Sequence, residues 1–172
     1  MEIMMSTLLM GTMFAIALPA GKAALDSLEL GNATREVERE LQTARMRAVS
    51  ANRPMRVKLN CPEDGQYRLV EVTGIVATDG AGSRCDESQY GFPAPRDNDR
   101  ATPEHDGPLR RLDSSIDALL GPELEFSPDG TTRLVVNGTV QTMTTDGVVQ
   151  VERNGAIQEI TVNALGIIAL VR

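Results

Sequence analysis

The first twenty residues constrain this chain more than any other part of its sequence. Residues 3–19 form an apolar run without an ionisable side chain, and Glu2 stands directly in front of it. An apolar helix of ~20 residues is long enough to cross a bilayer. A carboxylate among hydrocarbon tails is costly, so Glu2 needs a partner that neutralises it. The run therefore predicts a membrane helix, and its acidic residue suggests assembly with another molecule.

Two other interpretations of this segment stay open. A secretory signal peptide could be cleaved within residues 17–23, but such peptides begin with positive charge, and the only charge before Lys22 is that of Glu2. A helix in the core of a soluble protein is the second alternative, because Ser6 and Thr7 make the run less apolar than a typical span. Too few basic residues flank the segment to set its orientation.

A polar, helix-favouring segment continues from the apolar run to about residue 51. Small and aliphatic residues recur in it every three or four positions, on one helical stripe: Leu30, Ala33, Val37, Leu41, Ala44 and Ala48. Together the two segments predict a helix of ~50 residues, about 75 Å long, with a kink at Pro19. Asn52-Arg53-Pro54 should end it, because the residue before a proline avoids the α region. The alanine-rich stripe predicts a closely packed sheet of the same chain.

The remaining sequence is typical of short β-strands. Residues 55–60 alternate between apolar and polar, which predicts a strand with one buried face. Residues 66–78 predict a second strand, or two with a break at Gly74. Five further strands are predicted in the carboxy-terminal third: 124–126, 133–136, 148–151, 157–162 and 167–171. Tight hairpins are predicted between them at Asn137-Gly138, Asp146-Gly147 and Asn154-Gly155. This third should therefore form an antiparallel meander.

Residues 79–122 differ from the rest, because they hold many charges and five of the nine prolines. Apolar spacing from Leu112 to Leu120 predicts a short helix that Gly121 ends. Loops as long as the remainder are usually functional or disordered. We therefore predict that this segment binds a partner. Its candidate contact residues are Asp97, Asp99, Leu112 and Ile116.

Cys61 and Cys85 are the only cysteines. An even number of cysteines in a domain presented across a membrane favours a disulfide. Closing a loop of ~25 residues would stabilise the fold by about 3 kcal/mol in the chain-entropy model. Two free thiols are the alternative, and the spacing is too wide for a CxxC redox motif.

Candidate catalytic and metal sites are weak. His105 is the single histidine, and a triad with Ser114 or Ser115 lacks a nucleophile elbow, so a solvated loop histidine is the simpler interpretation. Acidic residues of the same loop could hold calcium, although the EF-hand spacing is not met: Asp97, Asp99, Glu104 and Asp106, with Asn98 beside them. No other cofactor is indicated, and nothing predicts an enzyme.

The net charge of −7 disfavours binding to nucleic acid, because an acidic surface repels phosphate. Aromatic residues that could stack on bases are also scarce, at 3% of the chain. Five basic residues lie close together in sequence, and we predict that they occupy solvated helix and strand faces: Arg45, Arg47, Arg53, Arg56 and Lys58.

Glu2, the apolar run and residues 15–19, which end in Pro19, resemble the amino-terminal region of type IV pilins and pseudopilins. Residues 37–49, followed by Asn52-Arg53-Pro54, are similar to the GspH/FimT subgroup, whose members usually have an alanine- and arginine-containing helix, a short break and then a first strand. Residues 124–131 are similar to the turn of that subgroup. The resemblance covers most of the chain, although residues 79–122 match none of its motifs.

The resemblance implies an α+β, pilin-like fold, in which a long helix packs on an antiparallel sheet or small β-sandwich. Residues 1–20 would be a transmembrane and filament-core segment, and residues 21–172 a periplasmic domain. That domain would comprise an amphipathic helix, the first strands, a variable loop with a short helix, and a β-meander: 21–52, 53–78, 79–122 and 123–172. Glu2 and Pro19 would act in assembly.

The resemblance also implies a function, a location and partners. The chain would be a minor pseudopilin of a type II secretion system, or alternatively a minor pilin of a type IV pilus. It would be methylated, lie in the bacterial inner membrane and enter a filament with other pilin subunits and an inner-membrane assembly platform. Family members carry a short basic leader that a prepilin peptidase removes. The sequence from Met1 contains no such leader, so processing is implied by the resemblance alone.

Overall fold

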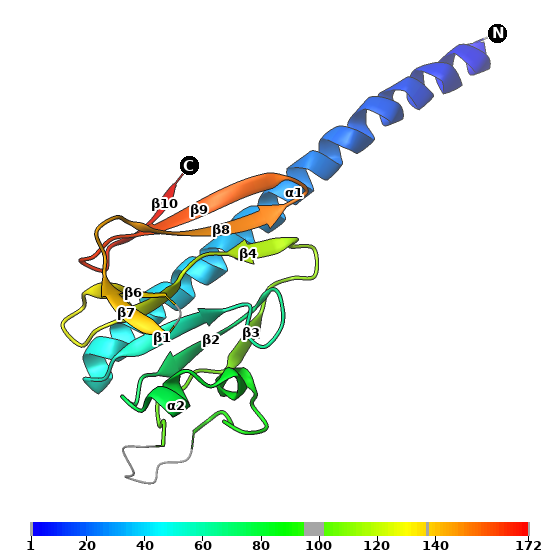
Figure 1. The fold of residues 1–172 in the computed structure, drawn as a ribbon. Helices are drawn as coiled ribbons and strands as arrows, with labels where there is room; N and C mark the ends of the chain where they lie inside the picture. The colour runs from blue at the N-terminus through cyan, green and yellow to red at the C-terminus, as the bar shows by residue number, and fades with distance from the viewer. Residues whose placement is uncertain (1, 95–101, 137, 172) are drawn as a thin grey trace.

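The computed structural model describes residues 2–94, 102–136 and 138–171, with side chains from residue 21 onward. Helix α1 (Glu2–Ala51) is 50 residues long, which confirms the single helix expected from the sequence. The residue after it, Asn52, has a left-handed φ of 51° and stands two residues before Pro54. Two antiparallel sheets lie along its carboxy-terminal half, so the fold is α+β as predicted (Figure 1).

Within the described residues, the larger sheet has six strands in the order β3-β2-β1-β5-β6-β7. Their bounds are β1 (Met55–Leu59), β2 (Gln66–Glu71), β3 (Leu109–Arg111), β5 (Glu123–Phe126), β6 (Thr132–Val136) and β7 (Thr139–Thr142). The smaller sheet has four strands in the order β10-β9-β8-β4. Their bounds are β4 (Ala118–Leu120), β8 (Gly147–Arg153), β9 (Ala156–Val162) and β10 (Ile168–Val171).

The core lies where the small-residue stripe of α1 meets both sheets. All six residues predicted for this stripe are buried, from Leu30 to Ala48. The larger sheet packs on them with side chains that include Val57 and Phe126, and the smaller sheet with Val149 and Ile160. The helix therefore serves as a common spine, and neither sheet could bury its apolar face without it.

The prediction that β1 has one buried face is wrong, because both of its faces are covered. Met55 and Val57 join the core beneath α1, whereas Arg56 and Lys58 are buried on the opposite face. The segment from residue 72 to residue 108, in its described parts 72–94 and 102–108, folds back over that opposite face. It carries two short helices, α2 (Val76–Asp79) and the 3₁₀ helix η1 (Gly82–Cys85). Residues 75–78, which could have formed a strand, thus belong to a helical turn.

The short helix predicted between Leu112 and Leu120 is also wrong. The structure places β3 before this stretch and β4 within it, and Leu119 lies opposite Val151 in the smaller sheet. Its apolar spacing suits a helix, but the backbone hydrogen bonds of β8 fix it as a strand. This is a case in which tertiary pairing overrides local periodicity.

The carboxy-terminal strands were predicted at the correct places, apart from β7, which the sequence did not indicate. They do not form one meander, because β5 to β7 belong to the larger sheet and β8 to β10 to the smaller one. Asp146-Gly147 therefore stands at the crossing between sheets instead of in a hairpin, and Gly147 begins β8. The β8–β9 hairpin at Asn154-Gly155 is confirmed, with φ values of 49° and 76°.

Candidate functional site

The amino-terminal part of α1 extends well beyond both sheets (Figure 1). Leu30 is its first residue in the core, and the preceding side chains from residue 21 are exposed apart from Asp26, which is half-buried. About 40 Å of helix lies between Glu2 and Leu30 at about 1.5 Å per residue. The backbone is helical at both Glu2 and Pro19, but their side chains lie outside the described residues. Their roles in assembly stay predictions.

Within the part of the chain that the structure describes, no helix has the length and apolar character needed to cross a membrane. The predicted span falls on residues 1–20, whose side chains lie outside this part.

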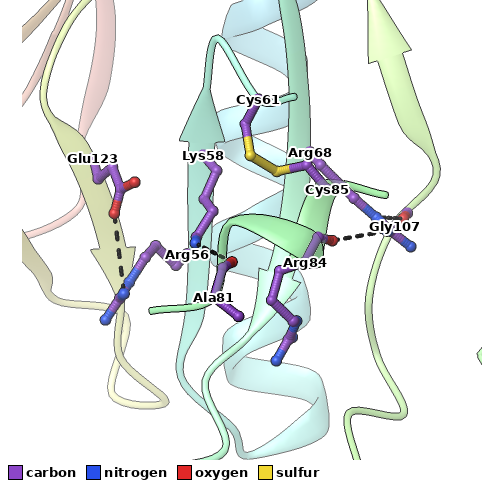
Figure 2. The surroundings of a disulfide bond; sticks show 9 residues. All are labelled: Arg56, Lys58, Cys61, Arg68, Ala81, Arg84, Cys85, Gly107 and Glu123. Atoms are coloured by element: carbon purple, nitrogen blue, oxygen red, sulfur yellow. Dashed lines mark hydrogen bonds and ion pairs between the residues drawn. A yellow bond between two sulfur atoms is a disulfide. The ribbon is translucent and has the colours of Figure 1, made fainter. Parts of the chain in front are cut away.

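A second notable feature is the segment of residues 72–108, which one buried arginine of β2 fastens to the larger sheet. The fully buried Arg68 donates to three backbone carbonyls of this segment. The distances are 2.8 Å to Gly107, 2.9 Å to Arg84 and 2.7 Å to Tyr90. Figure 2 shows the Arg68 side chain reaching the segment from the strand. One guanidinium thus holds three separate points of the same segment.

Arg84 of η1 binds both another part of the segment and the end of strand β2. Its Nη2 donates to Asp106 Oδ1 at 2.7 Å and to the Glu71 carbonyl at 2.8 Å. Its guanidinium lies 5.1 Å from the centroid of the Tyr90 ring, within the range of a cation–π contact. Asp106 Oδ1 also accepts the Glu71 amide at 2.7 Å. Burial raises the pKa of Asp106, and the charge of Arg84 opposes that shift.

The predicted disulfide between Cys61 and Cys85 is confirmed. It joins the β1–β2 turn to η1, with a Cα–Cα distance of 5.5 Å (Figure 2). The bond therefore ties the covering segment to the strand edge beside Arg68. Side-chain hydrogen bonds and a covalent link hold the segment at neighbouring points.

Two buried cations of β1 complete the covered face of the sheet, and their burial contradicts the prediction of solvated side chains. Arg56 pairs with Glu125 at 2.8 Å, directly across the β1–β5 ladder. Lys58 Nζ instead donates to the carbonyl of Ala81 at 3.3 Å. Burial lowers the pKa of Lys58. This ammonium is therefore the weakly compensated charge under the segment.

The four predicted partner contacts are not gathered on one exposed surface. Asp97 and Asp99 lie outside the described residues. Leu112 is 3% exposed within the core, and Ile116 packs partly buried against it. A direct contact through Leu112 would require the core to open, so partner binding by these residues stays a prediction.

Three apolar side chains of the covering segment are exposed, which the sequence did not predict. Val76 is 85% exposed, Phe92 is 48% exposed and Ile75 is 42% exposed. The available signal was their position beside turn-forming residues such as Gly74, where apolar side chains have no strand partner. These residues are better placed to meet another molecule than Leu112 is.

Neither of the weak chemical sites is assembled in the described residues. His105 is exposed, and its neighbour Asp106 binds Arg84 instead of orienting the imidazole. Among the residues that the structure describes, no group of three or more His, Cys, Asp or Glu side chains could hold a metal ion. Asp97, Asn98 and Asp99 lie outside those residues.

Comparison with known protein families shows to which family the chain belongs. The sequence profile of the type II transport protein GspH family matches residues 33–166, which is most of the chain. The chain belongs to the GspH family. This confirms the resemblance to the GspH/FimT subgroup of pilin-like proteins. The match begins within α1, and no curated protein sequence matches the chain significantly.

Two solved structures are similar to this GspH-family chain. The type IV minor pilin FimU of Pseudomonas aeruginosa PAO1 has a TM-score of 0.51 at 18% identity, covering 84% of this chain and 89% of FimU. The minor pseudopilin EpsH of the Vibrio cholerae type 2 secretion system has a TM-score of 0.49 at 12% identity, covering 83% of this chain and 96% of EpsH. At these identities the similarity to FimU shows the pilin-like fold alone.

We predict that Asp106→Ala destabilises the fold by about 3–5 kcal/mol, because it leaves the fully buried Arg84 with only the more distant carboxylate of Asp79, 3.9 Å away. Guanidinium unfolding of the full chain measures this loss. The matched control is Asp146→Ala, which removes an exposed carboxylate and should change stability by less than about 0.5 kcal/mol. Equal stability of the two variants would contradict the importance assigned to the Arg84–Asp106 pair.

We predict that Lys58 makes the stability of the fold rise with pH below the ordinary lysine pKa. Its native pKa is lowered, so in the window between that value and 10.5 the unfolded chain holds the proton and the native chain does not. Urea unfolding across this window should show that Lys58→Met removes the rise. The same substitution at the exposed Lys22 should leave it in place, and a rise that persists in Lys58→Met would count against the assignment.

Proposed function

We propose that this GspH-family chain is a minor pseudopilin subunit of a type II secretion system. It assembles into the periplasmic pseudopilus that drives protein export across the outer membrane. One combination carries the proposal: a GspH-family domain built on the carboxy-terminal half of a helix, whose other half projects freely and carries an apolar run. The apolar half is held in the inner membrane as a single span before it enters the filament.

Glu2 supplies the chemistry of assembly in this proposal. A carboxylate in an apolar environment is strongly disfavoured unless a positive charge neutralises it. The amino-terminal amine of a neighbouring subunit provides that charge and fixes the register between the two helices. The other partners are the inner-membrane assembly platform and a prepilin peptidase that exposes the mature amino terminus.

A minor pilin of a type IV pilus is the second candidate function. The fold similarity to FimU favours it, because that protein is a type IV minor pilin and covers most of this chain. The anchor and domain are compatible with both machines. Of the roles such a pilin could have, DNA capture is the least supported, because a chain with a net charge of −7 repels phosphate.

We predict that Glu2→Ala leaves the chain in the membrane fraction at normal abundance but lowers its incorporation into filaments several-fold. The substitution removes the charge that pairs with the neighbouring subunit and leaves the apolar run intact. Immunoblots of membrane and sheared-filament fractions measure the two pools. Ser6→Ala, within the same run, is the control and should assemble normally.

A strain that carries Glu2→Ala also distinguishes the two candidate functions. A pseudopilin defect abolishes export of the secreted proteins and leaves surface pili intact, whereas a pilin defect does the reverse. Normal incorporation of Glu2→Ala would refute the pairing role in either machine.

A further inference from the structure

At the point where α1 leaves the domain, one arginine binds two acidic residues of the helix. Arg153, at the end of β8, is 11% exposed in its side chain. Its Nε and Nη2 donate to Asp26 Oδ1 at 3.1 and 2.8 Å, and its Nη1 pairs with Glu29. Asp26 and Glu29 are three positions apart and so lie on one face of the helix. We call these three residues the exit clamp.

The domain side of the exit clamp is firmly held. Arg153 precedes the tight Asn154-Gly155 turn and lies opposite Ala156 in the β8–β9 ladder. The Asn154 amide donates to Asp117 Oδ2, and the Asp117 amide donates to Glu152. The guanidinium therefore projects from a hairpin end that is fixed on both sides, which makes it a rigid attachment point.

The helix side has no comparable attachment. Leu25 and Leu28 are 58% and 63% exposed, and Leu30 is the first residue of α1 in the core. Among the described residues, no hydrogen bond or ion pair other than those of Arg153 ties positions 21–29 to the sheets. The clamp is the last polar contact between the domain and the projecting helix.

Two glycines, Gly21 and Gly31, stand on either side of the clamped helical turn. A Cβ atom built at either position would meet no atom within 4 Å, so packing does not require glycine there. Each glycine makes a helix less stable than alanine would, because glycine has more conformational freedom to lose. The exit clamp therefore acts between two positions at which the helix is easily distorted.

The geometry points to Arg153 as a positioning residue that fixes the direction in which α1 leaves the domain. About 36 Å of helix separates Asp26 from the Glu2 end, so a tilt of about 20° would move that end by about 12 Å. This displacement is about as large as the diameter of a helix with its side chains, which is about 10–12 Å. Because the projecting helix is this long, a small change of angle at the exit clamp produces a large displacement of the apolar segment.

The exit clamp affects the direction of α1 more than it affects the stability of the fold. Asp26 and Glu29 are 37% and 46% exposed in their side chains, and ion pairs of such exposure are worth about 1 kcal/mol or less. Removing the clamp thus leaves the core from Ala33 onward intact while it frees the helix, with Leu30, to bend at Gly31. The consequence for filament entry rests on the proposed function, but the effect on helix direction does not.

Pulsed electron paramagnetic resonance on the full chain in detergent tests this inference. Spin labels are placed at Lys22→Cys on α1 and Thr139→Cys on β7, since both positions are exposed and the native cysteines are bonded to each other. The labelled protein with an unaltered exit clamp should give one narrow distribution of the distance between the two labels. Arg153→Met should broaden or shift it, and so should the double variant Asp26→Asn with Glu29→Gln, which opens the clamp from the helix side.

Two matched variants make the test specific. Adding Gly31→Ala to Arg153→Met should narrow the distribution again, because alanine stiffens the helix and its Cβ meets no neighbour. Arg111→Met removes the exposed Arg111–Glu63 pair, which does not touch α1, and should leave the distribution unchanged. An unchanged distribution in both clamp variants would overturn the positioning role.

Filament incorporation of the same variants separates this inference from the proposed function. Arg153→Met should enter filaments several-fold less than wild type, and Gly31→Ala should restore part of that loss. Arg153→Met could instead lose incorporation while the spin-label distances stay unchanged and Gly31→Ala restores nothing. That result would assign Arg153 to a direct contact with a neighbouring subunit and overturn the inference. Altered distances in a chain that does not enter filaments even as wild type would support it and contradict the proposed function instead.

Discussion

The contact between one stripe of small side chains on α1 and the two sheets is the interaction on which the rest of the structure depends. Alanines at positions such as 44 and 48 let strands of both sheets approach the same helix closely. Because the stripe begins at Leu30, no described side chain of α1 before it joins the core, and the last contacts of α1 with the domain are those of Asp26 and Glu29 with Arg153. A single helix is thereby divided into a spine for the fold and a projecting segment that is free to pack elsewhere.

The sequence predicted the parts of this arrangement that depend on periodicity and turn chemistry. The α1 stripe followed from spacing, the end of α1 from Pro54, and the β8–β9 hairpin from Asn154-Gly155. Strand β4 was mistaken for a helix because its apolar spacing fits both, and only the β8 ladder decides between them. The split into two sheets was not predictable either, since pairing between distant strands leaves no local mark.

At the candidate site, the main feature that the sequence did not predict is the burial of the second face of the larger sheet. Alternation in β1 made Arg56 and Lys58 look solvated, yet both are buried. The signal that could have revealed this was Cys85, because a disulfide to Cys61 must bring its surrounding residues over the edge of β1 and β2. Burying these cations is tolerable only because Arg56 pairs with Glu125 of β5 and Lys58 donates to a carbonyl of the covering segment.

Assembly through the projecting half of α1 is the central claim, and site-specific photo-cross-linking in cells tests it most directly. A photoreactive residue at position 8 of the projecting helix should give cross-links to other pilin-like subunits, whereas one at the exposed position 146 of the domain should give none to their helices. Absence of subunit cross-links from position 8, in cells whose secretion or pilus machinery is active, would contradict the account.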